Sequence, residues 1–181
     1  MIKPITGSSE AGDNWIEAEV GAAKCKDARL SKRLMLILKT MFESSQKSIK
    51  AACGGWAEVI GAYRFFNNQR VTAEVILAPH QEATRRRVQE QRRVLVIQDT
   101  SELDYSSQKE LRGTGPLNCE NRRGFLFHTQ YVVSEEAIPL GIWGSLVFAR
   151  DEEGAGPEGS AGRKQKPIEE KESVRWLEGY R

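Results

Sequence analysis

The chain has 181 residues, 39% of them hydrophobic and 29% charged, which is typical of a globular protein of one medium domain or two small ones. No apolar run is long enough to span a membrane, and the N-terminal residues lack the apolar core of a signal peptide. The three cysteines are widely spaced and odd in number, which disfavours a disulfide framework or a zinc site and favours a reducing cytoplasm.

Charge is distributed unevenly along the chain. Residues 1–93 contain 16 Lys and Arg against 10 Asp and Glu, whereas residues 94–181 contain 11 against 15. The net charges of these two parts are therefore +6 and −4, and residues 24–50 alone carry eight basic and two acidic side chains. This imbalance indicates that contact with a polyanion is concentrated in the N-terminal part, although lysine-rich helix faces are also common as simply solvated surfaces.

The N-terminal half is predicted to be helical after a disordered segment, residues 1–12. Asp13 is the expected cap of a helix to Val20, and Asp27 the expected cap of a second helix to Phe42. The second helix has the apolar stripe of a core-facing amphipathic helix, formed by Leu30, Leu34, Ile37, Leu38 and Met41.

The next segments are compatible with a DNA-binding arrangement. Ser48 to Ala52 is predicted to form one helical turn, Gly54-Gly55 to break it, and Trp56–Phe66 to form a third helix. The inward-facing residues of this helix are expected to be Trp56, Ile60, Ala62, Tyr63 and Phe66. The order of helix, glycine-containing turn and helix is compatible with a helix-turn-helix, although aromatic residues on such helices more often belong to a core.

Two basic faces are expected on the second helix. Arg29 and Arg33 are four residues apart and share one face, and Lys32 and Lys39 share another. We interpret this helix as having an apolar side for a core and a basic side for phosphates.

The chain then passes from helix to strand. Thr72 is the expected cap of a helix that Pro79 is predicted to interrupt, and the domain boundary is placed within residues 68–93. Val94–Ile97 is predicted to be a strand buried on both faces that ends at Asp99, where Thr100 turns the chain outward. A carboxylate at the end of such a strand suits a hard cation, but on this segment alone a turn-capping role for Asp99 is favoured.

The remaining segments predict a hairpin, a loop and a helix. Residues 124–133 and 138–148 are expected to pair as antiparallel strands, with irregularities at Pro139, Gly141 and Gly144. His128 is interpreted as a packed or hydrogen-bonded residue and not as a base. Residues 151–167 are predicted to be a loop, and residues 169–180 a helix that turns residues 174, 176 and 177 inward.

Several segments together resemble the Tn5-type (IS4-family) DDE transposases, in the family's order along nearly the whole chain. They are Ala28-Arg29-Leu30 with Arg33-Leu34, Lys47-Ser48-Ile49, Gly61-Ala62-Tyr63-Arg64-Phe65, the strand from Val96 to Leu103, Arg123-Gly124-Phe125 with His128, and Glu170-Lys171-Glu172-Ser173 with Trp176-Leu177. Any one of them alone is unspecific, and the combination carries the resemblance.

The resemblance implies an α+β chain with two domains. Residues 13–90 would be an all-helical domain that binds double-stranded transposon-end DNA, and residues 91–181 the first three strands and one helix of an RNase H-like catalytic domain. Family members are nucleoid-associated cytoplasmic enzymes that cut and join DNA with two Mg²⁺ ions, held by two Asp and one Glu, and act as homodimers. Asp99 falls on the first of these aspartates and would be both catalytic residue and metal ligand.

The resemblance and the helix geometry together nominate DNA-binding residues. Arg33 and Arg64 fall on family positions near end DNA, and Lys47 lies in a matching segment. Arg29 and Lys32 are added because of their places on the second helix.

The sequence departs from the family in its catalytic carboxylates. The second Asp and the Glu of the family lie beyond the helix that begins with Glu170-Lys171-Glu172-Ser173, so the chain is expected to be an N-terminal portion that is catalytically incomplete and holds Mg²⁺ poorly. Its sheet would also leave the first strand as an open edge. Two alternatives stay open: a non-catalytic regulator or inhibitor of transposition, and a helical DNA-binding protein unrelated to transposition.

Overall fold

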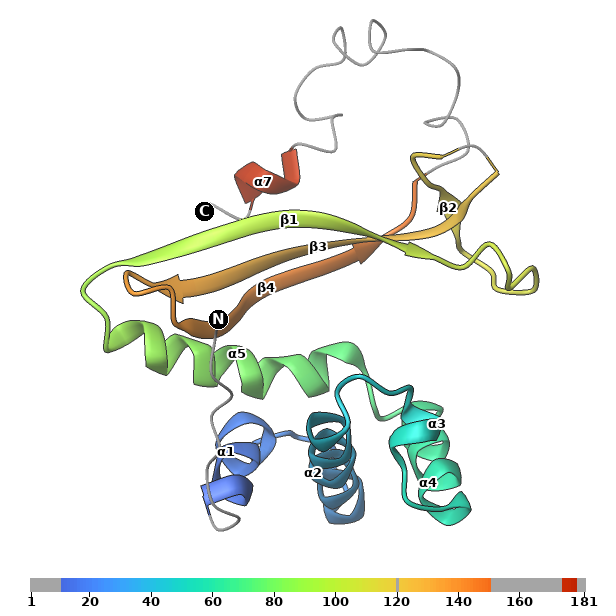
Figure 1. The fold of residues 1–181 in the computed structure, drawn as a ribbon, viewed down its shortest axis with the longest axis horizontal. Coiled ribbons are helices and arrows are strands. Elements are labelled where there is room, and N and C mark those ends of the chain that lie inside the picture. The colour runs from blue at the N-terminus through green and yellow to red at the C-terminus, as the bar shows by residue number, and fades with distance from the viewer. Residues whose placement is uncertain (1–10, 120, 151–173, 179–181) are drawn as a thin grey trace, which may run out of the picture. The chain divides into compact units, whose positions relative to one another are not determined.

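The computed structural model describes residues 11–119, 121–150 and 174–178, and it is an α+β structure in which helices precede an antiparallel sheet (Figure 1). Internal contacts divide the chain into two compact units that meet between Arg86 and Arg87. Within the described ranges, no helix is both long enough and apolar enough to cross a membrane. The N-terminal segment predicted to be disordered lies, up to residue 10, outside the described residues.

Side-chain oxygens satisfy free N–H groups at the start of several helices of the first unit. The helices of this unit are α1 (Ala11–Val20), α2 (Ala28–Glu43), α3 (Ile49–Ala52), α4 (Trp56–Phe66) and most of α5 (Ala73–Gln89). The carboxylate of Asp27 accepts a hydrogen bond from the N–H of Arg29 at 2.9 Å, which confirms the predicted cap of α2. Ser48 caps α3 in the same way through Ala51. The predicted cap at Asp13 is wrong, because α1 already begins at Ala11 and Asp13 lies inside it.

A single apolar core holds α1, α2 and α4 together. Its buried members are Ile16, Val20, Ala23, Cys25, Leu34, Ile37, Ala62 and Phe65. Leu30 and Leu38 pack against this cluster, so most of the predicted stripe of α2 is confirmed. Met41 is the exception and remains 41% exposed at the end of the stripe.

The buried face of α4 agrees with the prediction at Ala62 and differs from it at other positions. Val59, Ala62 and Phe65 are buried, whereas Trp56 is 71% exposed and Tyr63 50% exposed. Phe66, also predicted to face inward, is likewise exposed. The cause is that α4 is apolar around most of its circumference, so the sequence offers two stripes at helical spacing. Packing against α2 selects the stripe with the small Ala62 at its centre.

Helix α5 runs without a break across Pro79. Thr72 caps it by accepting from the N–H of Val75 at 3.2 Å, as predicted, but the predicted interruption at Pro79 is wrong. A proline inside a helix removes one backbone hydrogen bond. Packing of the first turn on the core through Val75, and the burial of Ala83 after the proline, hold the helix on both sides of the defect.

The second unit is built on an antiparallel sheet with β3 (Arg123–Ser134) in its middle. β3 pairs with β1 (Val94–Asp104) on one side and with β4 (Pro139–Phe148) on the other, and the two-residue β2 (Gly115–Pro116) pairs with its first residues (Figure 1). The predicted hairpin of β3 and β4 is confirmed. Its register shifts twice, on either side of Gly141, where the sequence predicts irregularities.

Strand β1 is longer and more exposed than predicted. It continues to Asp104, so Asp99 lies in mid-strand opposite Thr129, and the chain does not turn outward at Thr100. Gly124 allows this extension, because a Cβ there would collide with the carbonyl oxygen of Leu103. Leu95 is 61% exposed and Val96, which points to the opposite face, is 46% exposed, so the predicted burial on both faces is wrong. An apolar β-branched run reports strand propensity but not how many faces are covered.

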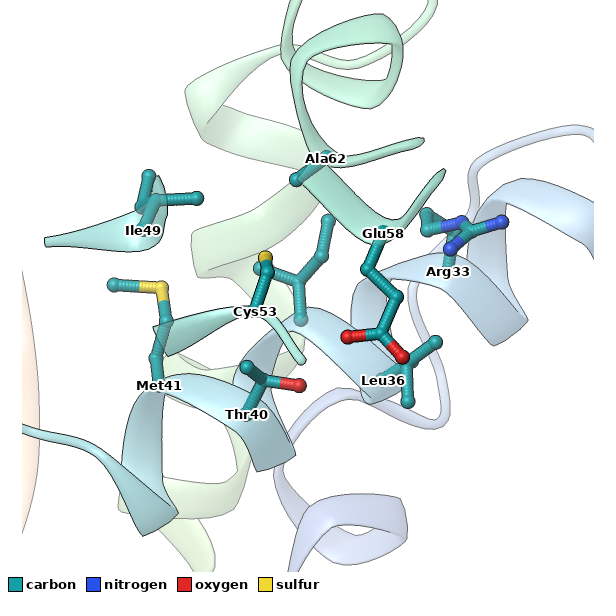
Figure 2. Close-up of a pocket in the computed structure, with 9 residues that line it drawn as sticks. Arg33, Leu36, Thr40, Met41, Ile49, Cys53, Glu58 and Ala62 are labelled. Carbon is teal, nitrogen blue, oxygen red and sulfur yellow. The ribbon is translucent and has the colours of Figure 1, made fainter. Parts of the chain in front are cut away.

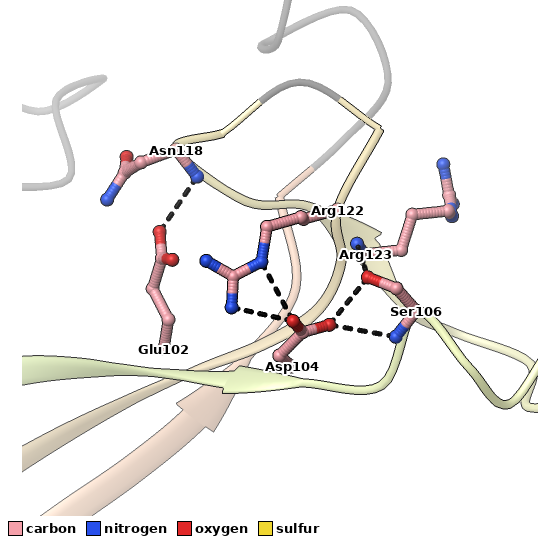
Figure 3. A network of polar contacts seen from close by, with 6 residues as sticks. All are labelled: Glu102, Asp104, Ser106, Asn118, Arg122 and Arg123. Carbon is pink, nitrogen blue, oxygen red and sulfur yellow. Dashed lines mark hydrogen bonds and ion pairs between the residues drawn. The ribbon is translucent and has the colours of Figure 1, made fainter.

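A polar network holds the loops that follow β1 (Figure 3). Both oxygens of Asp104 are used: one accepts from the Ser106 N–H at 2.9 Å and the other from the Arg122 guanidinium at 2.8 Å. The hydroxyl of Ser106 also accepts from the N–H of Arg123, and Glu102 accepts from the N–H of Asn118. These bonds tie the start of β3 to the end of β1.

His128 is a packed residue, as predicted. It is 4% exposed; its Nδ1 lies 2.8 Å from the Thr100 hydroxyl and its Nε2 3.2 Å from the Gln98 side-chain oxygen. The ring of Trp176 in α7 (Val174–Glu178) packs edge-on against it at 5.3 Å. Trp176 and Leu177 nevertheless stay 44% and 48% exposed, so their predicted inward placement is wrong except for this contact. The predicted loop 151–167 lies outside the described residues.

Candidate nucleic-acid interface

A basic groove lies between α2 and α4 in the first unit. Its volume is about 390 Å³, and its lining is more polar than apolar. The residues that line it are Asp27, Arg29, Leu30, Arg33, Ala57, Gly61, Arg64, Phe65 and Asn68. Three of the five residues nominated as DNA-binding, Arg29, Arg33 and Arg64, therefore meet in one place.

Helix geometry explains how these arginines converge. Arg29 and Arg33 are one turn apart on α2 and stand on the same face, next to the stripe that enters the core. Arg64 lies in the last turn of α4, between the exposed Tyr63 and the buried Phe65. Because Phe65 anchors α4 against the core shared with α2, the adjacent residue, Arg64, is held in the lining of the groove.

Gly61 gives Arg33 its place against α4. A methyl group at Gly61 would lie 2.8 Å from Nη1 and 2.9 Å from Cζ of Arg33, closer than real carbon atoms approach. Figure 2 shows Arg33 at one edge of a small apolar pocket of about 10 Å³ that also adjoins Ala62, with Ile49 and Met41 at the opposite edge. The absence of a side chain at Gly61 lets the guanidinium lie over the helix backbone.

The two central arginines, Arg33 and Arg64, differ from Arg29 in their ion pairing. Neither Arg33 nor Arg64 forms an ion pair with any residue in the part of the chain that the structure describes. Glu58 lies near Arg33 in Figure 2, but its carboxylate accepts from the N–H of Gly54 at 2.8 Å and closes the first turn of α4. Among the described residues, the groove therefore contains two guanidinium groups that form no ion pair.

Arg29 differs from them because Asp27 holds it. Its guanidinium donates to both carboxylate oxygens of Asp27, at 3.4 Å and 3.3 Å. These bonds, the bond from the Arg29 N–H and the charges of Arg29 and Arg70 lower the pKa of Asp27 below its ordinary value. The same pair raises the pKa of Arg29.

Lys32 and Lys47, the other two nominated residues, lie outside the groove. Lys32 is on α2 and Lys47 is in the turn between α2 and α3. Sequence patterns did not single out Arg70, whose charge acts on Asp27. The sequence feature that could have pointed to Arg70 is Asn68, two residues earlier. Its side chain accepts from the N–H of Arg70 at 3.0 Å and so forms a turn after α4.

Asp99 stands apart from these residues, in the second unit. Its carboxylate accepts from the N–H of Thr100 at 2.8 Å. Across the described ranges, no three His, Cys, Asp or Glu side chains are grouped so that they could hold a metal ion. One carboxylate is too few to hold two Mg²⁺ ions, so Asp99 and the side chains described around it do not by themselves fit this pair of ions.

Residues 12–71 match the family model described as transposase DNA-binding. The match covers nearly all of α1, the whole of α2 to α4, and every residue of the groove. This part of the chain is therefore similar to transposase DNA-binding domains, and DNA is the partner that this similarity implies.

Proposed function

We propose that the chain binds the ends of a transposon as the N-terminal portion of a Tn5-like, IS4-family DDE transposase, with the groove between α2 and α4 as its DNA contact. The observation that carries this proposal is the convergence of Arg29, Arg33 and Arg64 within the segment that matches transposase DNA-binding domains. Guanidinium groups suit this task because they bind phosphate oxygens and guanine edges in bidentate geometry.

The second half of the proposal concerns the sheet. Three antiparallel strands in the order β1-β3-β4 are compatible with the first strands of an RNase H-like domain. None of the described strands pairs with the second edge of β1, so a further strand could be added there. Asp99, in the middle of β1, would be the first of the three metal-binding carboxylates. Asp99→Asn should then leave DNA binding unchanged, and weaker duplex binding by this variant would contradict its assignment to catalysis.

The test of the DNA contact is a salt series with a fluorescently labelled duplex, read by anisotropy. Each phosphate that the groove neutralises releases counterions, so affinity should fall steeply between about 50 and 200 mM salt. Arg33→Ala and Arg64→Ala should each weaken binding and reduce the slope of log K against log salt by about 1.

A matched control is Lys109→Ala, which removes an exposed positive charge from the second unit. This variant should keep the affinity and the slope of the original chain. Binding that does not change with salt, or equal losses in Lys109→Ala and in the groove variants, would overturn the proposed interface.

A further inference from the structure

The groove contains one acidic side chain among its arginines, and that side chain is Asp27. As the cap of α2, it needs only a side-chain oxygen that accepts from the N–H of Arg29. Asparagine caps helices about as well as aspartate does, so capping alone does not require a negative charge here. The charge has a second consequence, because it binds the guanidinium of Arg29 through both oxygens.

This pair places a negative charge where a DNA phosphate would otherwise meet Arg29. The Arg29 side chain is 91% exposed and that of Asp27 is 25% exposed, so solvent, and hence a DNA phosphate, can reach the pair. A phosphate that approaches Arg29 must compete with the carboxylate and is repelled by it. A base edge has no net charge, and its amino groups can donate to a carboxylate while guanine offers acceptors to an arginine.

Resting on the proposed DNA-binding function, we propose that Asp27 is a specificity-determining residue that keeps Arg29 from DNA phosphates and reserves this end of the groove for base edges. Arg33 and Arg64 supply the phosphate contact that is independent of sequence. Asp27 and Arg29 supply discrimination between DNA sequences. A DNA sequence without matching base edges leaves the pair without hydrogen-bond partners, while the carboxylate of Asp27 still repels the DNA phosphates.

The decisive variant is Asp27→Asn, which keeps the cap and removes the charge. With a random-sequence duplex it should bind about two- to fivefold more tightly, the range of one exposed charge pair, and its salt slope should steepen by about 1. In an Arg29→Ala background the same change should give a smaller gain, because it then removes only the repulsion by the carboxylate and releases no guanidinium. Melting temperature and helix content should stay at the original values, whereas Asp27→Ala should lower both by removing the cap.

Selection from a random-sequence duplex library supplies the second measurement. The original chain should enrich a narrower set of sequences than Asp27→Asn does. Unchanged affinity and slope in Asp27→Asn, an equal gain in the Arg29→Ala background, or equally narrow selection by both chains would each overturn the inference. Failure of the proposed function is a separate outcome, since the original chain would then show no salt-dependent duplex binding at all.

Discussion

The contact between Gly61 and Arg33 predicts a variant that is more stable but binds DNA less well. In Gly61→Ala the new methyl would stand 2.8 Å from Nη1 of Arg33, so the guanidinium must leave its place over α4. The shift itself costs little, because the atoms that move are the far end of a flexible side chain. Alanine in a helix interior is favoured over glycine by up to about 1 kcal/mol, so the melting temperature should rise by a few degrees.

The expected loss of binding comes from the displaced guanidinium alone. If Arg33 contributes about 1 kcal/mol to duplex binding, Gly61→Ala should raise Kd roughly fivefold, with Arg33→Ala giving a similar loss. The assay is anisotropy with one duplex at one salt concentration, together with thermal unfolding of each variant. In the double variant Gly61→Ala with Arg33→Ala, the second change should add no further loss, since the two act through one group.

Two results would refute this reasoning. Wild-type affinity in Gly61→Ala would mean that the position of the guanidinium does not matter for binding. Additive losses in the double variant would mean that Gly61 acts on DNA by another route, such as direct approach of the α4 backbone.

Two further predictions concern stability. Phe65→Ala should lower the free energy of unfolding by roughly 3–5 kcal/mol, because this ring is 1% exposed in the core that joins α2 to α4, and chemical denaturation measures it. Hydrogen bonds from the Ser106 hydroxyl and N–H, and then from Arg122, lower the pKa of Asp104 from 3.8 to about 2. The free energy of folding that Asp104 contributes is therefore complete above about pH 4 and is lost as the pH falls through 2. Asp104→Asn should therefore melt below the original chain at pH 7 and approach it near pH 2, and a constant difference across this range would contradict the assignment.

The sequence predicted local features of the helices well where one interaction decides them. Asp27 can cap α2 through its own side chain, and the break at Gly54-Gly55 marks the start of α4, so both predictions hold. The face of α4 could not be predicted in the same way. Both Trp56 with Tyr63 and Val59 with Ala62 have helical spacing, and only the close approach of α2 chooses between them.

Strand β1 shows a second limit of the sequence. The apolar run Val94–Ile97 marks a strand, but its end depends on its partner, because the ladder with β3 continues as far as Gly124 permits. For this reason Asp99, expected at a strand end, lies in mid-strand. In the groove, Arg29 and Arg33 follow from helix spacing alone, whereas the arrival of Arg64 beside them depends on tertiary packing.

Three consecutive residues of α4 have different surroundings, so the residue that stabilises the domain is not the residue that is expected to bind DNA. Successive residues of a helix point about 100° apart, so Tyr63 faces solvent, Arg64 faces the groove and Phe65 enters the core. The side chain that fixes α4 is therefore not the one that we expect to meet DNA. Loss of Phe65 should remove both folding and binding, whereas loss of Arg64 should weaken binding and leave the fold intact. The core therefore fixes the helices and the arginines of the groove lie outside it, so we expect that Arg33 and Arg64 can be replaced one at a time without unfolding the domain.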